Sequence, residues 1–187
     1  MFDLDILHEM IKDTVKLPLK DHYGKYQIEL TEPQRPSSSV TIYGLPDATI
    51  AIRVDAFQSP KTVFRNTRGE CKRADFVVFA NTSRKRVILY IEMKATKGSE
   101  EEIKQQLKGA QCFMAYCREI GRVFWGKRDF LDDYVERFIS IGHTSIAKKP
   151  TRMPPITGVH DRPDRMMKIS SRIICTSISL QHETERR

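Results

Sequence analysis

Two apolar runs of β-type sequence, separated by a short polar segment, constrain this chain more than any other feature. The runs are Phe76–Ala80 and Val87–Ile91, and the polar residues Asn81–Lys85 between them are typical of a hairpin loop. An acid, Asp75, stands directly before the first run, and the triplet Glu92-Met93-Lys94 ends the second. If the two runs pair as an antiparallel hairpin, the acid and the triplet meet at one end of the sheet.

The side chains of Glu92 and Lys94 are predicted to point to one face of their strand, because side chains alternate along β-strands. Two carboxylates and an ammonium group at the rim of a sheet can bind a divalent cation and activate water for phosphodiester hydrolysis. Glu-x-Lys also occurs at Glu70, after a turn-like stretch, and at Glu102, in a helical pattern whose i and i+2 positions do not share a face. The alternative interpretation is an exposed ion pair on a β-hairpin.

Asp75, followed after sixteen residues by Glu92-x-Lys94 and then by a helical pattern, resembles the PD-(D/E)XK nuclease superfamily. The segments 74–79 and 91–97 are similar to the core of Holliday-junction resolvases and several restriction endonucleases, although Ala74 stands where the family often has Pro. The resemblance covers about residues 49–125. It implies an α/β fold with a restriction endonuclease-like core in the order α-βββ-α-β, in which helices flank a mixed sheet.

The resemblance also implies a cofactor and roles for the triplet. Mg²⁺, for which Mn²⁺ can substitute, would be held by Asp75, Glu92 and the backbone carbonyl of Met93, because hard divalent cations prefer oxygen ligands. Lys94 would orient the attacking water and balance charge in the transition state. The competing acids are Asp47, which follows a proline but lies a whole strand upstream, and Asp55.

Two further catalytic candidates come from the resemblance alone. Families of this type often carry an acid on the first helix, which points to Glu9, although a solvated helix face is the simpler interpretation of this residue. Some relatives place a Gln and a Tyr one helical turn apart after the lysine, which points to Gln111. Tyr116 lies five residues beyond it rather than four.

The formal net charge of +8 suits a polyanionic partner, and we expect DNA. Basic residues flank the acidic cluster on both sides, where they would hold phosphates near a metal ion. For any single lysine, an ordinary solvated surface remains the alternative. The candidate nucleic-acid-binding residues are Lys72, Arg73, Lys97, Lys104 and Lys108.

The length of 187 residues predicts a single domain. Its core would occupy about residues 49–147, and residues 148–187 would form a basic loop and an appended β segment, with a β-run at 169–180. The expected elements are helices at 2–16, ending near Pro18, and from Ser99 to Gly121, and strands at 40–43, 49–57, 71–80, 87–95 and 138–146. Ser99 and Glu102 match a capping box, and the strand after that helix is expected to run parallel to 87–95.

No apolar run approaches the roughly 20 residues that span a bilayer. The four cysteines lack zinc-type pairing, which favours reduced thiols in a cytoplasmic protein.

The resemblance and the net charge together predict a Mg²⁺-dependent endonuclease acting on DNA, of a restriction, defence or junction-resolving type. A homodimer would suit double-strand cleavage. The alternatives are a non-catalytic nucleic-acid-binding module on the same scaffold and an RNA-directed nuclease.

Overall fold

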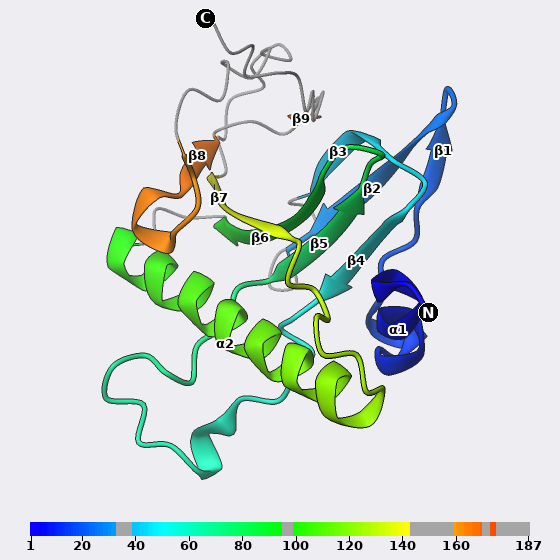
Figure 1. Ribbon diagram of the computed structural model, residues 1–187. Coiled ribbons are helices and arrows are strands. Elements are labelled where there is room, and N and C mark those ends of the chain that lie inside the picture. The colour runs from blue at the N-terminus through cyan, green and yellow to red at the C-terminus, as the bar shows by residue number, and fades with distance from the viewer. Residues whose placement is uncertain (33–38, 95–98, 143–158, 170–172, 175–187) are drawn as a thin grey trace, which may run out of the picture.

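The computed structural model describes residues 1–32, 39–94, 99–142, 159–169 and 173–174. It contains two α-helices, α1 (Asp3–Met10) and α2 (Glu100–Phe124), with strands between and after them and short 3₁₀ turns (Figure 1). The strands are β1 (Lys20–His22), β2 (Lys25–Thr31), β3 (Ser39–Leu45), β4 (Thr49–Arg53), β5 (Phe76–Asn81), β6 (Arg86–Lys94), β7 (Val135–Gly142), β8 (Met167–Ile169) and β9 (Ile173–Ile174).

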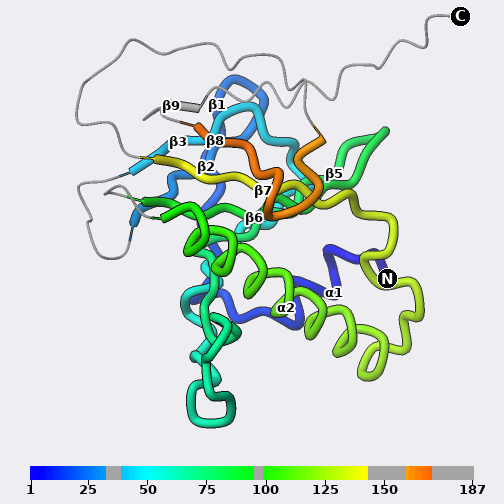
Figure 2. The backbone as a smooth tube through the Cα atoms, turned by 90° about the vertical axis from the view of Figure 1, so that its left-hand side faces the viewer, coloured from blue at the N-terminus to red at the C-terminus, as the bar shows by residue number. Residues whose placement is uncertain are grey.

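The strands form two sheets. The larger has the order β4-β5-β6-β7-β8, in which β4, β5 and β6 are antiparallel while β7 and β8 run parallel to β6. The smaller has the order β1-β2-β3-β9, with β9 parallel to β3. Figure 2 shows both helices below the strands. The protein is therefore a mixed α/β structure in which helices cover one face of the larger sheet.

The larger sheet is buried on both faces, which explains why its central strands are continuous apolar runs rather than alternating ones. Val77, Phe79 and Tyr90 pack in a core with α1 and α2. Phe76 and Val78, on the opposite face, pack in a second core with the smaller sheet. This alternation fixes the face to which every other residue of β5 and β6 points.

The predictions for α2 and the strand after it are confirmed. The Ser99 hydroxyl accepts a hydrogen bond from the Glu102 amide at 3.1 Å and caps the helix. Apolar residues at helical spacing pack against the sheet: Leu107, Ala110, Met114 and Cys117 are buried, and Ile103 is partly buried. The helix continues past the predicted end, to Phe124. β7 is parallel to β6, as expected, and begins three residues before the predicted start, while its predicted end at residues 143–146 lies outside the described residues.

The first helix is shorter than predicted, because its C-terminal part joins the edge of the sheet. α1 ends at Met10 rather than near Pro18. Lys16 forms a β-bridge with Ile52, and the Leu17 amide donates to the Ala51 carbonyl at 2.8 Å. Pairing with β4 therefore replaces helical hydrogen bonds that the spacing of apolar residues predicted.

The predicted strands at 49–57 and 71–80 are also too long. β4 stops at Arg53 and β5 starts at Phe76, so an extended loop lies between them. The Phe57 amide donates to the Val54 carbonyl at 3.0 Å and the Lys72 amide to the Gly69 carbonyl at 2.9 Å, so the chain turns at 54–57 and at 69–72 instead of continuing as strand. The loop then passes against α2 on its way to β5. It comes so close that a Cβ added to Gly109 would lie 1.7 Å from the Lys72 carbonyl oxygen, so only glycine fits there.

Most of the smaller sheet was not predicted. β1 and β2 are joined by a two-residue turn, Tyr23–Gly24, in which both residues have positive φ. Leu30 is buried in β2, and β3 is longer than the strand predicted at 40–43. The predicted order α-βββ-α-β thus omits an inserted antiparallel unit. At the C-terminal end, β8 extends the larger sheet and β9 the smaller one. Residues 170–172 and 175–180 of the β-run predicted at 169–180 lie outside the described residues.

Neither helix within these described ranges is both long and apolar enough to cross a membrane.

Candidate active site

The hairpin of β5 and β6 brings Asp75 and Glu92 together. Phe76 pairs with Ile91, so the next positions outward, Asp75 and Glu92, face each other across the two strands. The Met93 amide donates a hydrogen bond to Asp75 Oδ2 at 2.7 Å, which fixes this carboxylate at the end of β6. The convergence predicted from the sequence is therefore present.

Glu92 and Lys94 lie on the same face of the sheet as Tyr90, toward α2. Lys94 Nζ lies 3.1 Å from Glu92 Oε1 and 4.0 Å from Glu102 Oε1, in the first turn of α2. Glu92 is only 1% exposed, and its other oxygen, Oε2, is buried without a hydrogen-bond partner within the described residues. A buried carboxylate oxygen without a partner is costly, so this atom requires an explanation.

The two carboxylates perturb each other. Burial, followed by the charge of Asp75, raises the pKa of Glu92 to about 8, while Lys94 and the Asp75 backbone amide act in the opposite direction. Burial also raises the pKa of Asp75 to about 6, against the lowering effect of the Met93 amide, and the charges of Asp55 and Glu32 add to the increase. At neutral pH this pair retains a proton unless another cation lies between the two groups.

The available oxygen atoms fit a hydrated Mg²⁺ ion better than a closed metal cage. Across the described ranges, no group of three or more His, Cys, Asp or Glu side chains is arranged to hold a metal ion. Mg²⁺ usually binds one or two carboxylates and completes its coordination with water and substrate phosphates. Asp75 and Glu92 provide two carboxylates, and one Glu92 oxygen has no partner in the part of the chain that the structure describes. The Met93 carbonyl as a third ligand stays a prediction.

No protein-family model, curated protein or solved structure matches the chain. The functional interpretation therefore depends on the chemistry of the cluster itself.

The structure does not bring the two remaining catalytic candidates to this cluster. Glu9 Oε2 accepts a hydrogen bond from the Trp125 indole at 3.0 Å, which ties α1 to the end of α2. Gln111 Nε2 donates to Glu136 Oε2 at 2.8 Å. Glu136 pairs with Ile88, four residues before Glu92, which corresponds to roughly 13 Å along the strand. Both candidates therefore have structural contacts elsewhere.

The predicted nucleic-acid-binding residues differ in how available they are. Lys104 lies 3.0 Å from Glu100 and Lys72 lies 3.9 Å from Glu102, so acids of α2 already neutralise both. Arg73 is half-buried, with its guanidinium 5.7 Å above the Phe57 ring. Lys108 is exposed on α2. Lys97 lies outside the described residues.

Two acids near the cluster were not predicted as site residues: Glu32 was missed, and Asp55 was considered only as a competing acid. Glu32 follows β2 and raises the pKa of Asp75, yet in the sequence it lies in a segment rich in Pro and Ser. Asp55 follows β4 next to Asp75, because the Val54 amide donates to the Asp75 carbonyl at 2.8 Å. No local sequence pattern predicts a role for Glu32, because it lies near Asp75 only through the packing of the smaller sheet on the larger one.

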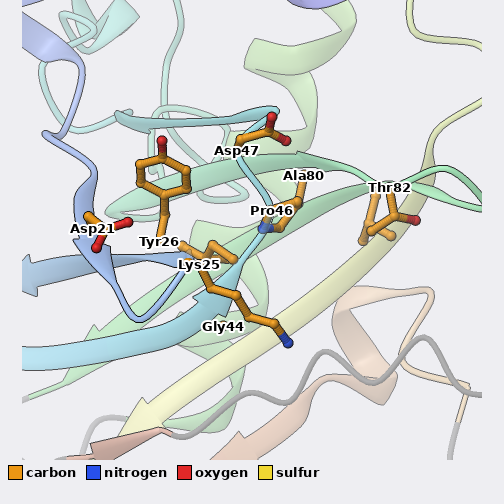
Figure 3. Close-up of a pocket in the computed structure, with 11 residues that line it drawn as sticks. Asp21, Lys25, Tyr26, Gly44, Pro46, Asp47, Ala80 and Thr82 are labelled. Carbon is orange, nitrogen blue, oxygen red and sulfur yellow. The ribbon is translucent and has the colours of Figure 1, made fainter.

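Asp47, the other competing acid, lies at the opposite end of the hairpin. It lines a pocket of about 540 Å³ between the two sheets, together with Asp21 of β1 and with Ala80 and Thr82 beside the hairpin tip (Figure 3). Its carboxylate accepts a hydrogen bond from the Ala48 amide at 2.7 Å and so stabilises the turn after β3. Asp47 is therefore separate from Asp75 and Glu92.

Proposed function

We propose that this protein is a Mg²⁺-dependent nuclease that hydrolyses DNA phosphodiester bonds at Asp75, Glu92 and Lys94. The observation that carries the proposal is Glu92 Oε2, a buried carboxylate oxygen for which the described residues provide no hydrogen-bond partner. The charge of Asp75 lies close enough to raise the pKa of this side chain. A divalent cation would neutralise both carboxylates and provide the missing partner.

The residues present divide the work of hydrolysis in a simple way. Asp75 and Glu92 would hold the metal ion, and the hydrogen bond from the Met93 amide fixes the Asp75 carboxylate at the end of β6. When bound, the ion lowers the pKa of a coordinated water and stabilises negative charge on the scissile phosphate. Because Glu92 is almost fully buried, its interactions are weakly screened by solvent.

Lys94 would act on the substrate side of the cluster. Its ammonium group lies 3.1 Å from Glu92, so its charge is held next to the proposed metal position. There it can donate hydrogen bonds to the attacking water or to a phosphate oxygen, and it balances the charge that develops in the transition state. Lys94 is thus an electrostatic partner rather than a free base.

Two further observations favour a nucleic acid as the substrate. The chain has a formal net charge of +8, which attracts a polyanion. The spacing of Asp75, Glu92 and Lys94 resembles the PD-(D/E)XK nucleases, many of which cut DNA. The restriction endonuclease-like arrangement of the core remains part of this proposal.

The proposal is tested by incubating the protein with plasmid DNA, single-stranded DNA and RNA, in Mg²⁺, in Mn²⁺ and in EDTA. We expect metal-dependent cleavage of DNA that is lost in Asp75→Asn and Lys94→Ala. The matched control is Lys85→Ala, which removes an exposed lysine at the far end of the same hairpin. Retained cleavage in both site variants would refute the proposal. Cleavage of RNA alone would reassign the substrate, and salt-sensitive binding without cleavage would indicate a non-catalytic module.

A further inference from the structure

The loop that joins β4 to β5 projects from the rest of the protein. We call residues 56–73 the protruding loop. Figures 1 and 2, two views at right angles, both show it extending past α2 and away from the two sheets. Antiparallel neighbours need a connection of only a few residues, and loops as long as this one usually have a function. The loop also leads directly to Asp75.

Contacts within the protruding loop give its tip a defined shape. Both oxygens of Glu70 accept backbone hydrogen bonds, from the Thr67 amide at 3.1 Å and the Arg68 amide at 2.8 Å. Asn66 Oδ1 accepts a hydrogen bond from the Cys71 amide at 3.2 Å. These bonds close a compact turn, so side chains at the tip are presented from a fixed backbone.

The base of the loop is anchored to α2. Gly109 allows the backbone to pass so closely that an added Cβ would lie 1.7 Å from the Lys72 carbonyl oxygen. The Phe57 ring packs against Phe113 of α2, with ring centroids 5.1 Å apart, and Arg73 covers the same ring. The tip is therefore positioned by the same helix that covers the candidate active site.

The tip combines exposed apolar groups with cations that have no acidic partner. Val63 is 76% exposed and Phe64 is 53% exposed. Lys61, Arg65 and Arg68 are exposed, and none of them forms an ion pair in the part of the chain that the structure describes. The acid that follows them, Glu70, is occupied by backbone amides. A rigid projection with free arginines and an exposed aromatic ring matches a partner with phosphates and flat apolar faces.

We propose that the protruding loop binds the nucleic-acid substrate beside the cleavage site, with Arg65 and Arg68 on backbone phosphates and Phe64 stacked on an unpaired base. Arginine pairs with phosphate oxygens through two parallel hydrogen bonds. Aromatic side chains stack on unpaired bases whatever the identity of the base, and apolar side chains insert between distorted base steps of a duplex. The proposal extends the nuclease proposal by naming its substrate class, which is DNA with unpaired or distorted bases.

The phosphate contacts are tested by measuring binding of the full chain to a labelled duplex with a three-nucleotide bulge, in EDTA, over a range of salt concentrations. The test variant is Arg65→Ala/Arg68→Ala. The matched control, Arg84→Ala/Lys85→Ala, removes the same charge from the exposed hairpin tip at the other end of β5. We expect about 50-fold weaker binding and a salt dependence reduced by about two counterions for the loop variant, and less than about threefold weaker binding for the control. An equal effect in both variants would overturn the proposal.

The base contact is tested with Phe64→Ala and Phe64→Trp on bulged and fully paired duplexes of the same sequence. We expect Phe64→Ala to reduce the preference for the bulged duplex about tenfold and Phe64→Trp to preserve it, because stacking depends on an aromatic ring. Far-UV circular dichroism checks that each variant is folded. An unchanged preference in Phe64→Ala would overturn the proposal. So would self-association that is lost in Phe64→Ala, because the ring would then serve a contact between protein copies.

These measurements need no metal ion and no turnover, so they separate the two proposals. Loss of binding in the loop variants without any cleavage by the wild-type protein would support the loop and refute the nuclease. If the wild-type protein cleaves DNA in a metal-dependent way and the loop variants bind the bulged duplex as tightly as the wild type, the nuclease proposal is supported and the loop proposal is refuted.

Discussion

Two glutamates on the face of the larger sheet that α2 covers have opposite surroundings. Glu136 of β7 accepts hydrogen bonds from Tyr90 at 2.9 Å and Arg118 at 2.8 Å on one oxygen, and from Gln111 at 2.8 Å on the other. Glu92 of β6 has Lys94 on one oxygen and no partner on the other within the described residues. Both oxygens of Glu136 are thus used within the fold, whereas one oxygen of Glu92 has no donor among the described residues and can accept a ligand.

The comparison predicts its largest effect on catalysis. In a DNA cleavage assay with Mg²⁺, Glu92→Gln should lower the turnover rate about 10³-fold or more, because it removes a metal ligand and changes the charge of the cluster. Glu136→Gln should leave the turnover rate of the folded protein within a few-fold of the wild type. Equal losses in the two variants would remove the distinction between the acids.

The second effect is on stability, where substitution of Glu136 should cost more than substitution of Glu92. Glu136→Ala leaves the partners Tyr90, Gln111 and Arg118 without their acceptor, and should lower the free energy of unfolding by about 2–3 kcal/mol. Glu92→Gln should stabilise the metal-free protein at pH 8 by an amount on the order of 1 kcal/mol, because it removes a poorly compensated buried charge. Urea unfolding monitored by circular dichroism measures both changes. A destabilising Glu92→Gln would indicate that Glu92 is a structural residue.

The third effect is a pH dependence of the metal-free protein. The unfolded chain releases the Glu92 proton near its ordinary pKa of 4.5, whereas the folded protein holds it up to a pKa of about 8. Between these values the unfolded state binds fewer protons, so stability must fall as the pH rises. Asp75 adds to the fall between 3.8 and about 6.

This fall is measured as the free energy of unfolding from pH 4.5 to pH 8 in EDTA. Glu92→Gln should flatten the profile, and Mg²⁺ should restore stability at the upper end. A profile that is the same in the wild type and in Glu92→Gln would show that Glu92 ionises normally in the folded protein.

The parts that sequence reasoning predicted are those determined by local patterns. The apolar runs of β5 and β6 and the polar tip between them fixed the hairpin, and alternation then placed Glu92 beside Lys94. The Ser99 cap and the apolar stripe of α2 depend on residues within one helix. Each of these predictions needed contacts only between near neighbours in the sequence.

The parts that were missed depend on distant contacts. The turn at Tyr23–Gly24 lacks the usual Asn-Gly signal, so β1 and β2 were not predicted. The apolar spacing of the first helix extended past Met10, but pairing of Lys16 with Ile52 overrode it. The family resemblance points to Gln111 as a site residue, and only the packing of α2 on β7 shows that its side chain binds Glu136.

The central claim is that Asp75 and Glu92 hold a divalent cation, and calorimetric titration of the full chain with Mn²⁺ at pH 8 tests it most directly. The wild type and Glu136→Gln should each bind one ion, while Asp75→Asn and Glu92→Gln should bind it at least about tenfold more weakly. Absence of binding to the wild type, or equal binding to the wild type and to Glu92→Gln, would contradict the claim.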